Sequence, residues 1–462
     1  MRIKFGTEGW RGVIADDFTI ANVEIVAAAT ARYLLEANPP GKRLVVVGHD
    51  CRMMSEQFAE ACARTLNSFG FDVVLNDKPT ATPALSAGVL AHQAQGACVF
   101  TASHNPGIFH GLKFKPYYGG AAITEITDAI EKKLYQGDPH GSDSGTTEVV
   151  DFLPAYFERL GRQVEVERIQ ASGLRLAFDA MYGAGAGNFA RLLPKMDIVA
   201  IREERNPIFP GIHPEPIFEM LGPLVEAAKG RDLGIAFDGD ADRLAAIDEN
   251  GSFVDSHRIF AIAFKHLRER RGQTGDVVKT LTTTRMIDKL AARYGVRCYV
   301  TPVGFKHIVE KMLEGGVLMG GEESGGMGVT QNLPERDAML MALLLMEAIV
   351  MSGKTLGQLV EEVFAEVGPH WYHRIDAQFQ RSEMAALRDV VNGLSLAEVG
   401  GFGVLETNRM DGTLFELEGG RFLMLRASGT EPVVRIYAEA EEASVAARLA
   451  TEGENLLRKA LA

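Results

Sequence analysis

The chain has 462 residues, of which 46% are hydrophobic and 24% charged, as is typical of a folded globular protein. This length exceeds what one hydrophobic core supports, so we expect several domains. The formal net charge of −13 disfavours nucleic acid or an anionic membrane as the main partner. The chain as a whole would also repel an anionic substrate, so local arginines and lysines must reverse the potential where such a substrate binds.

No segment of the chain predicts a membrane or secretory role. Residues 1–6 contain no apolar run of the signal-peptide type, and the longest apolar run, residues 338–346, is too short to span a bilayer. We expect that run to form a buried helix, in a cytoplasmic protein without a membrane partner. The four cysteines lack CxxC spacing, so reduced thiols are the simplest expectation.

Strand and helix patterns alternate along most of the chain. Helices are predicted over 22–37, 55–69 and 82–92, and strands over 44–47, 71–75 and 96–100. Later strands are expected at 174–179, 235–237, 244–247, 276–280, 297–301 and 317–319. The last part mixes strands over 422–426 and 433–438 with a helix over 443–460. This alternation predicts α/β layers, followed by a small α+β domain.

Composition shifts suggest where the domains divide. Residues 136–147 are rich in Gly, Ser, Asp and Thr, and Gly368-Pro369 is a second breaker. We predict four domains, over residues 1–140, 150–250, 251–368 and 369–462. The first three share an order of apolar strand, polar loop and helix, which suggests a loose architectural repeat.

The segment Thr101-Ala102-Ser103-His104-Asn105-Pro106 puts a hydroxyl beside an imidazole after a predicted strand. The proline biases the residue before it away from helix, so we expect Ser103 to lie on a loop. A serine next to a histidine on a loop is weak evidence of catalysis when taken alone.

Asp238, Asp240 and Asp242 lie at alternate positions between two predicted strands. A tight turn opened by Gly239 would direct all three carboxylates at one point, and hard oxygen ligands of this kind suit Mg²⁺. A solvated acidic turn is the alternative, but three such close aspartates repel one another without a cation. An EF-hand loop fits less well, because Arg243 stands where that loop needs glycine and strands flank the turn.

Two further loops have residues suited to a sugar phosphate. In residues 320–326, Gly-Gly-Glu-Glu-Ser-Gly-Gly, Glu322 and Ser324 are spaced for vicinal sugar hydroxyls, although a flexible glycine turn is the simpler interpretation of this segment alone. Residues 426–432, Arg-Ala-Ser-Gly-Thr-Glu-Pro, combine a guanidinium, two hydroxyls and a glycine, which suits a phosphate or an ordinary polar turn.

Two glycine-containing stretches are weaker candidates. Residues 5–12, Phe-Gly-Thr-Glu-Gly-Trp-Arg-Gly, suit a loop that holds Arg11 against an anion, or a surface turn with Arg11 packed on Trp10. Residues 301–306 are expected to end a strand with Lys306 on a turn that contains Gly304, where a solvated lysine is the commoner outcome. The glycines at 183, 185 and 187 miss the GxGxxG spacing of dinucleotide sites by one position.

Taken in order, these five segments resemble the α-D-phosphohexomutase superfamily (phosphoglucomutase/phosphomannomutase), whose members have FGTxGxRG, TASHNP, DGDxDR, GExSG and RxSGTEP stretches. The resemblance spans nearly the whole chain. It implies three related α/β domains with mixed sheets and a smaller C-terminal α+β domain around a central cleft. It also implies interconversion of hexose 1-phosphate and hexose 6-phosphate, of glucose or mannose, by a monomer or homodimer.

The resemblance assigns roles to particular residues. Ser103 would be the phosphoserine, and it would hold Mg²⁺ together with Asp238, Asp240 and Asp242. A hexose 1,6-bisphosphate, such as glucose 1,6-bisphosphate, would be both intermediate and activator. The candidates for the general base are His104, Lys113 and Arg11. The residues implied to bind the sugar phosphate are Arg243, Gly304, Lys306, Glu322, Ser324, Arg426, Ser428, Gly429 and Thr430.

The chain departs from its relatives in two places: it has His110-Gly111-Leu112-Lys113 where Asn-Gly-x-Lys is frequent, and Ala427 where proline is common. Neither change removes a charged group, but the first departure puts the detailed geometry near Lys113 in question. Phosphoglucosamine mutase and a phosphoserine-dependent sugar-phosphate hydrolase are the alternative functions. The Gly-Glu-Glu-Ser-Gly and Val-Gly-Phe-Lys stretches are more similar to the glucose-phosphate mutases.

Overall fold

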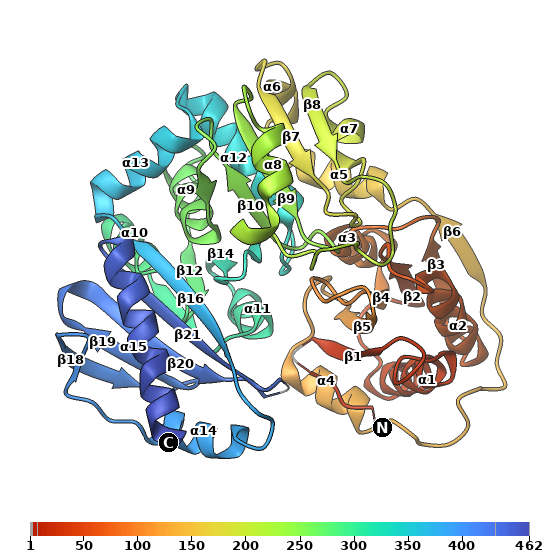
Figure 1. Cartoon of the computed structure of the whole chain (residues 1–462). Helices are drawn as coiled ribbons and strands as arrows, with labels where there is room; N and C mark the ends of the chain where they lie inside the picture. Colours follow the sequence, from red (N-terminus) through yellow and green to blue (C-terminus); the bar gives the residue numbers. More distant parts are fainter. Residues whose placement is uncertain (1–2, 7, 430, 462) are drawn as a thin grey trace. The chain divides into compact units, whose positions relative to one another are not determined.

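The computed structural model describes residues 3–6, 8–429 and 431–461. The chain forms two compact units, Met1–Val278 with Gly304–Leu359, and Lys279–Val303 with Val360–Ala462. Most of the helices and strands of both units are labelled in Figure 1.

The first sheet has six strands in the order β1-β5-β4-β2-β3-β6. Its parallel part consists of β4, β2, β3 and β6, and β5 pairs antiparallel with both β4 and β1. The strands are β1 (Gly9–Val13), β2 (Lys42–His49), β3 (Asp72–Asn76), β4 (Ala94–Phe100), β5 (Phe109–Pro116) and β6 (Thr147–Val150). The helices are α1 (Ile20–Ala37), α2 (Ser55–Ser68), α3 (Thr82–His92) and α4 (Thr124–Glu131).

Side chains that alternate along these strands separate two cores. Val45 and Val47 of β2 join α1 and α2 in one apolar cluster, whereas Val46 joins α3 in another on the opposite face of the sheet. This is the two-residue period of a strand buried on both sides. The two layers of helices are visible in Figure 1.

Strand β1 contradicts the expectation of a loop around Arg11. Residues 9–13 pair with β5, with Arg11 opposite Gly111. Gly9, at φ 147°, allows this pairing, because a Cβ there would lie 2.1 Å from the Leu112 carbonyl oxygen. The strand depends on a partner one hundred residues away, so the local pattern did not reveal it.

The second sheet has the order β11-β10-β9-β7-β8. Its strands are β7 (Arg175–Asp179), β8 (Asp197–Ile201), β9 (Leu233–Phe237), β10 (Leu244–Ile247) and β11 (Phe253–Val254). Strands β8, β7 and β9 are parallel, and β10 returns antiparallel to β9. The accompanying helices are α5 (Leu153–Gly161), α6 (Val166–Gln170), α7 (Asn188–Leu192), η1 (Phe218–Met220) and α8 (Gly222–Ala227).

The rest of this unit is built around two capped helices, α9 (Ser256–Glu269) and α12 (Ala338–Ser352). Asp255 and Asp337 cap them by accepting hydrogen bonds from backbone N–H groups in the first turn. Between them lie α11 (Phe305–Glu314), β14 (Val317–Gly321) and β15 (Met327–Val329), and β14 and β15 pair antiparallel. β12 (Asp276–Thr280) and α13 (Leu356–Val367) extend from this unit into the second.

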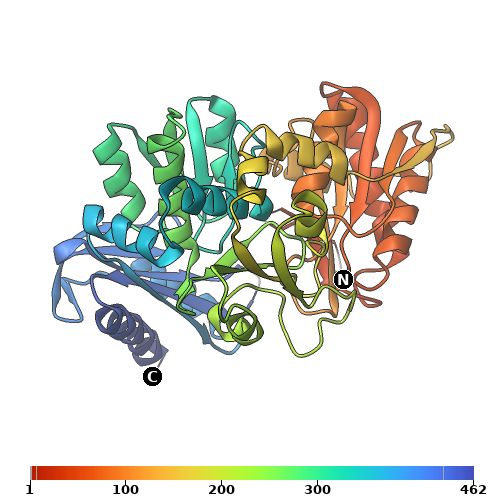
Figure 2. The same ribbon diagram turned by 90° about the horizontal axis from the view of Figure 1, so that it is seen from above.

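The second unit is dominated by an antiparallel sheet in the order β16-β21-β20-β19-β18-β17. One face packs on α14 (Met384–Gly393) and α15 (Ala443–Leu461) through an apolar cluster, and Figure 2 shows α15 along that face. The strands are β16 (Trp371–Gln378), β17 (Glu398–Val399), β18 (Phe402–Asn408), β19 (Thr413–Leu417), β20 (Arg421–Ala427) and β21 (Val433–Ala440). η2 (Glu418–Gly420), α10 (Met286–Tyr294) and β13 (Cys298–Thr301) complete the unit.

The expected fold class is confirmed: α/β domains with mixed sheets precede a smaller α+β domain. The predicted domain boundaries stay a prediction. The apolar run at 338–346 is a buried helix, and α12 continues past it because Glu347 is paired inside the protein with His266 at 2.7 Å and Arg271 at 2.9 Å. Within the described residues no single helix is long and apolar enough to cross a membrane; α12 passes that test only in a bent pair with α13.

His110 is a buried titratable group in the first core, so it gives folding a pH dependence. Burial and, next, the charge of Arg52 lower its pKa to about 3. A histidine with a lowered folded pKa contributes stability above the unfolded value near 6.5, and that contribution is lost as the pH falls toward 3. At pH 5 the loss is about 2 kcal/mol.

We therefore expect chemical denaturation to give a smaller free energy of unfolding at pH 5 than at pH 7.5. In His110→Phe, which keeps a ring stacked on Phe18, this difference should shrink by about 2 kcal/mol. His140→Phe, which changes an exposed histidine, is the control and should keep the difference. Equal pH dependence in wild type and His110→Phe would contradict the assignment.

Candidate active site

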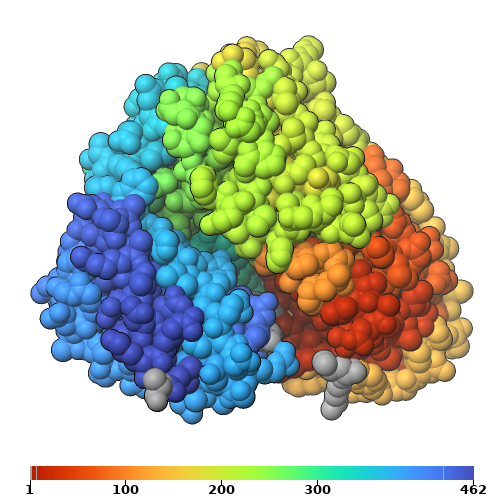
Figure 3. Space-filling model, in the orientation of Figure 1, coloured from red at the N-terminus to blue at the C-terminus, as the bar shows by residue number. Residues whose placement is uncertain are grey.

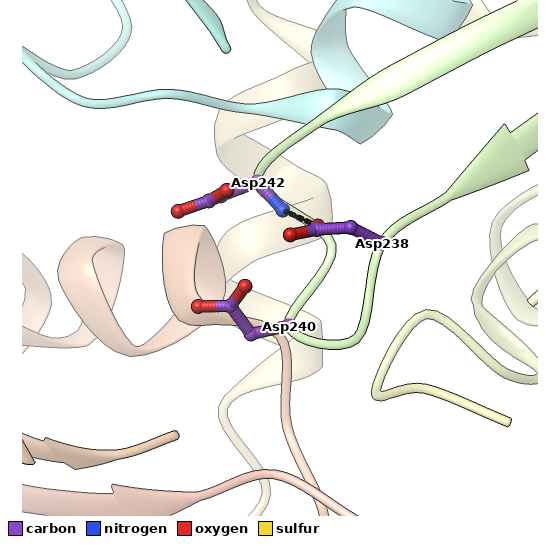
Figure 4. A group of neighbouring side chains, drawn as sticks. All are labelled: Asp238, Asp240 and Asp242. Atoms are coloured by element: carbon purple, nitrogen blue, oxygen red, sulfur yellow. Dashed lines mark hydrogen bonds between the residues drawn. The ribbon is translucent and has the colours of Figure 1, made fainter. Parts of the chain in front are cut away.

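The three aspartates lie on the turn between β9 and β10 and point to the same side (Figure 4). Strand pairing places Phe237 opposite Leu244, which closes the turn. The backbone N–H groups of Asp242 and Arg243 donate to Asp238 Oδ1 at 3.0 and 3.1 Å, and Ala241 adopts a left-handed φ of 58°. One carboxylate oxygen from each aspartate lies within 4.8 Å of the other two. The predicted convergence is therefore present.

These carboxylates form a site that suits a hard cation. All three are fully buried, and Asp240 Oδ1 and Asp242 Oδ1 accept no hydrogen bond within the described part of the chain. Burial, then the charges of Asp242 and Asp240, raises the pKa of Asp238 well above its ordinary value. A Mg²⁺ ion would bind the free carboxylate oxygens. Its charge would also offset the unfavourable negative charge of the buried Asp238.

Ser103 lies directly beside this site. It follows β4 on a turn, is buried, and its Oγ donates to Asp238 Oδ2 at 2.7 Å. The backbone of the neighbouring segments meets here too, since the Thr82 N–H donates to the Asp240 carbonyl at 3.0 Å and the Thr82 hydroxyl to Asp240 Oδ2 at 2.6 Å. The first two sheets thus supply the serine and the aspartates to one place.

Lys113 is buried among acidic groups. Its Nζ lies 2.8 Å from Asp240, 3.1 Å from Asp242 and 3.5 Å from Glu8. Burial would lower its pKa, but the charges of Asp240 and Asp242 outweigh burial and raise the pKa above its usual range. Lys113 is an ammonium in this arrangement and is suited to donate a proton, not to accept one.

Arg336 is a cation that sequence analysis missed. Its guanidinium lies 2.5 Å from Glu8, 2.7 Å from Asp242 and 3.4 Å from Glu322. Arg336 therefore links the aspartate turn to the loop after β14. The only sequence signal was an Arg-Asp pair immediately before the apolar run at 338–346, and nothing local predicts partners more than 300 positions away.

The loop with Glu322 and Ser324 is attached to the aspartate turn through the backbone. Arg243 forms an antiparallel bridge with Gly326, and the Leu244 N–H donates to Gly325 at 3.3 Å. Glu322 accepts a hydrogen bond from the Gly304 N–H at 3.1 Å, and burial, partly offset by Arg336, raises its pKa to about 7. Ser324 is half-buried on the same turn.

The remaining candidates of the first unit are placed as follows. Arg11 is exposed on β1 and its guanidinium donates to Asn105 Oδ1 at 2.5 Å, next to the serine turn, and His104 is half-buried on that turn. Lys306 was expected on a glycine turn; it lies instead in the first turn of α11, because Gly304, at φ 127°, begins the helix. Arg243 Nη1 lies 3.6 Å from Glu215.

The predicted phosphate loop belongs to the second unit and connects β20 to β21. Arg426 Nε donates to Asp411 Oδ2 at 2.9 Å, so this guanidinium is paired with a carboxylate. The Ser428 N–H donates to the Val433 carbonyl at 2.9 Å, which closes the hairpin, and Gly429 is exposed at its tip. Thr430 lies outside the described residues.

Comparisons with known proteins agree with this arrangement. Models of phosphoglucomutase/phosphomannomutase α/β/α domains I, II and III match residues 2–140, 154–251 and 255–367, and the model of the C-terminal domain matches 382–455. A phosphoglucomutase/phosphomannomutase of Thermococcus kodakarensis is 32% identical over 99% of both chains. A phosphoglucosamine mutase of Streptococcus mutans is 29% identical over 94% of both.

A solved structure is similar over the same length. The crystal structure of a Thermus thermophilus protein assigned as a phosphomannomutase is 36% identical, with a TM-score of 0.87, and covers 99% of both chains. Together with the four domain matches, this shows that the chain belongs to the phosphoglucomutase/phosphomannomutase family, which is part of the α-D-phosphohexomutase superfamily. It is accordingly an isomerase of the mutase type.

Proposed function

We propose that the protein interconverts the 1-phosphate and the 6-phosphate of glucose and of mannose through a phosphorylated Ser103 and a hexose 1,6-bisphosphate. The observation that carries this is the Ser103 hydroxyl, 2.7 Å from Asp238 within a trio of buried carboxylates. A serine beside a cation site is an arrangement that suits phosphoryl transfer. The T. kodakarensis relative named as a phosphoglucomutase/phosphomannomutase supports the choice of sugars.

The transfer is a displacement at phosphorus. A sugar hydroxyl oxygen attacks the phosphorus on Ser103, the new O–P bond forms, and the bond to Ser103 Oγ breaks with its electron pair on Oγ. The hydroxyl proton passes to a base, for which His104 and Arg11 remain the candidates because Lys113 is already an ammonium, and Oγ takes up a proton. Return of the other phosphate of the bisphosphate to Ser103 releases the isomerised monophosphate.

The aspartates and their neighbouring cations would stabilise this transfer. Asp238, Asp240 and Asp242 would hold Mg²⁺, which neutralises charge on the transferring phosphoryl when bound. Lys113 and Arg243 lie at the same carboxylates and would contact phosphoryl oxygens. Glu322 and Ser324 would hold ring hydroxyls, together with Gly304 and Lys306.

The distal phosphate, which does not react, needs its own anion site. We assign it to Arg426, Ser428, Gly429 and Thr430, where the phosphate would replace Asp411 as the partner of the Arg426 guanidinium. Holding both ends of the substrate orients the acceptor hydroxyl and raises its effective concentration. A hydrolase would not need this second phosphate-binding site.

The assay that tests this proposal supplies glucose 1-phosphate, mannose 1-phosphate or glucosamine 1-phosphate with Mg²⁺ and a trace of glucose 1,6-bisphosphate. We expect turnover of glucose and mannose phosphates within about tenfold of each other, because they differ at one hydroxyl. Glucosamine phosphate should be at least tenfold slower; the reverse order would favour the alternative represented by the S. mutans relative. Phosphate release as fast as sugar turnover would instead indicate a hydrolase.

A further inference from the structure

Arg52 is a completely buried arginine whose side-chain hydrogen bonds all go to backbone carbonyl oxygens. Its Nη2 donates to the carbonyl oxygens of Ser103 at 2.7 Å and Asn105 at 2.6 Å. Its Nη1 donates to those of Pro106 and Phe109, both at 3.0 Å. One guanidinium therefore donates hydrogen bonds to four carbonyl oxygens of the segment that contains Ser103.

The ion pair of Arg52 does not by itself explain why the charge is buried. Asp50 Oδ2 lies 3.3 Å from Nε, and the Phe209 ring lies 4.9 Å from the guanidinium carbon. An apolar pair of similar volume could replace a buried ion pair without loss of stability. It could not satisfy the carbonyls of an irregular segment, whereas the planar fork of an arginine reaches two pairs of acceptors at once.

The backbone of Ser103 needs such support, because it is strained. Its φ is 51°, in the left-handed region that costs a non-glycine residue about 1–2 kcal/mol. The Ser103 N–H donates to Thr101 Oγ1 at 2.9 Å, while its carbonyl is held by Arg52. On the other side of that carbonyl, a Cβ added to Gly239 would lie 2.4 Å from the oxygen. Ser103 is thus fixed at both peptide groups, and its Oγ faces Asp238.

The segment held by Arg52 also contacts the loop that follows β8 in the same unit. A Cβ added to Gly107 would lie 2.6 Å from the Ile208 carbonyl oxygen, and Phe209 follows directly to cover Arg52. Figure 3 shows that the yellow-green surface of the first unit borders its orange surface. Arg52 is therefore fully buried between the serine turn and the Phe209 ring.

We infer that Arg52 is a positioning residue for phosphoryl transfer: it holds the strained serine turn so that Ser103 Oγ faces the aspartate trio. This inference rests on the proposed function, in which Ser103 carries the phosphoryl group. Arg52 itself does not touch Ser103 Oγ or the carboxylates of the trio in the described contacts. Its effect should therefore appear in the rate of transfer and not in the affinity for the sugar phosphate.

The test replaces Arg52 with lysine, which keeps the charge but has a single nitrogen and cannot reach two pairs of carbonyls. The matched control is Arg231→Lys, because Arg231 also donates to two backbone carbonyls and an aspartate. Arg231 lies at the end of the second sheet that is opposite to the aspartate turn. For Arg52→Lys we expect kcat to fall about 100-fold with KM within twofold of wild type. Arg231→Lys should change neither.

Hydrogen exchange gives a readout that does not depend on activity. In Arg52→Lys, the amides of a peptide covering residues 101–112 should exchange at least tenfold faster, with unchanged exchange elsewhere in the chain. If the lysine variant does not fold, Arg52→Gln, which removes the buried charge, takes its place with the same expected results. A uniform rise in exchange over the whole chain would indicate a general structural role and overturn the inference.

The two proposals fail in distinguishable ways. An unchanged kcat, or a rise in KM alone, in Arg52→Lys would overturn the positioning role while leaving the function of Ser103 intact. Activity that survives Ser103→Ala would overturn the proposed function and, with it, the catalytic role of Arg52. Faster exchange confined to residues 101–112, together with a loss in kcat, supports the inference.

Discussion

Ser103→Ala should lower kcat by at least about 10⁴-fold, because the variant has no oxygen to which the phosphoryl group can be attached. Folding should survive the change. The variant loses one hydrogen bond to a buried carboxylate, Asp238 Oδ2, which costs on the order of 1–3 kcal/mol. Steady-state turnover of glucose 1-phosphate, measured beside thermal unfolding, separates the two effects.

Ser86→Ala is the matched control for this variant. Ser86 is likewise buried, and its hydroxyl donates to a carboxylate oxygen, Glu335 Oε2, at 3.4 Å. We expect Ser86→Ala to keep kcat within about threefold of wild type at a similar cost in stability. Intact-mass measurement after incubation with glucose 1,6-bisphosphate should show one added phosphoryl group on wild type and on Ser86→Ala, and none on Ser103→Ala. Turnover by Ser103→Ala within tenfold of wild type would show that Ser103 is not the phosphoryl carrier.

The parts of the fold that could be predicted are those that local pattern determines. The helix predicted over 82–92 is α3, Thr82–His92, and the strands predicted over 244–247 and 276–280 are β10 and β12. Each has an uninterrupted apolar or periodic signal of its own. In contrast, β1 is rich in glycine and acquires its conformation from pairing with β5, so only the folded chain reveals it.

The same distinction holds for the site. The alternate aspartates at 238, 240 and 242 converge because one tight turn carries all three, and this could be foreseen. Arg336 and Arg52 could not, because their partners lie 328 positions away at Glu8 and up to 57 positions away at Phe109. A charged residue that acts through distant backbone carbonyls leaves no motif, since any sequence can supply a carbonyl.

Asp240→Asn should remove most of the Mg²⁺-dependent activity, with kcat at least about 100-fold lower at the Mg²⁺ concentration that saturates wild type. Asparagine keeps the volume of the side chain but removes one negative charge from the trio. Asp240 Oδ2 already accepts from Thr82 and Lys113, while Oδ1 has no donor among the described residues. Oδ1 is therefore the atom available to the cation, and its loss of charge weakens the ligand.

Metal binding can be measured without turnover. A ligand that binds only the folded state raises stability by RT ln(1 + [L]/Kd), so Mg²⁺ should raise the unfolding temperature of wild type. The rise should vanish in Asp240→Asn. Without Mg²⁺, the variant should be similar to wild type in stability, because two effects offset each other. Removal of one buried negative charge reduces the repulsion among the three aspartates. At the same time, Lys113 loses one of its three acidic partners.

Asp248→Asn provides the control for charge removal nearby. Asp248 is buried at the far end of β10, and its Oδ1 accepts from the N–H groups of Asn250 and Ser252, which asparagine can also satisfy. We expect this variant to keep both the activity and the Mg²⁺-dependent rise in unfolding temperature. If Asp240→Asn kept the rise while Asp248→Asn lost it, the cation would bind elsewhere. Only loss confined to Asp240→Asn fits a cation held by the trio beside Ser103.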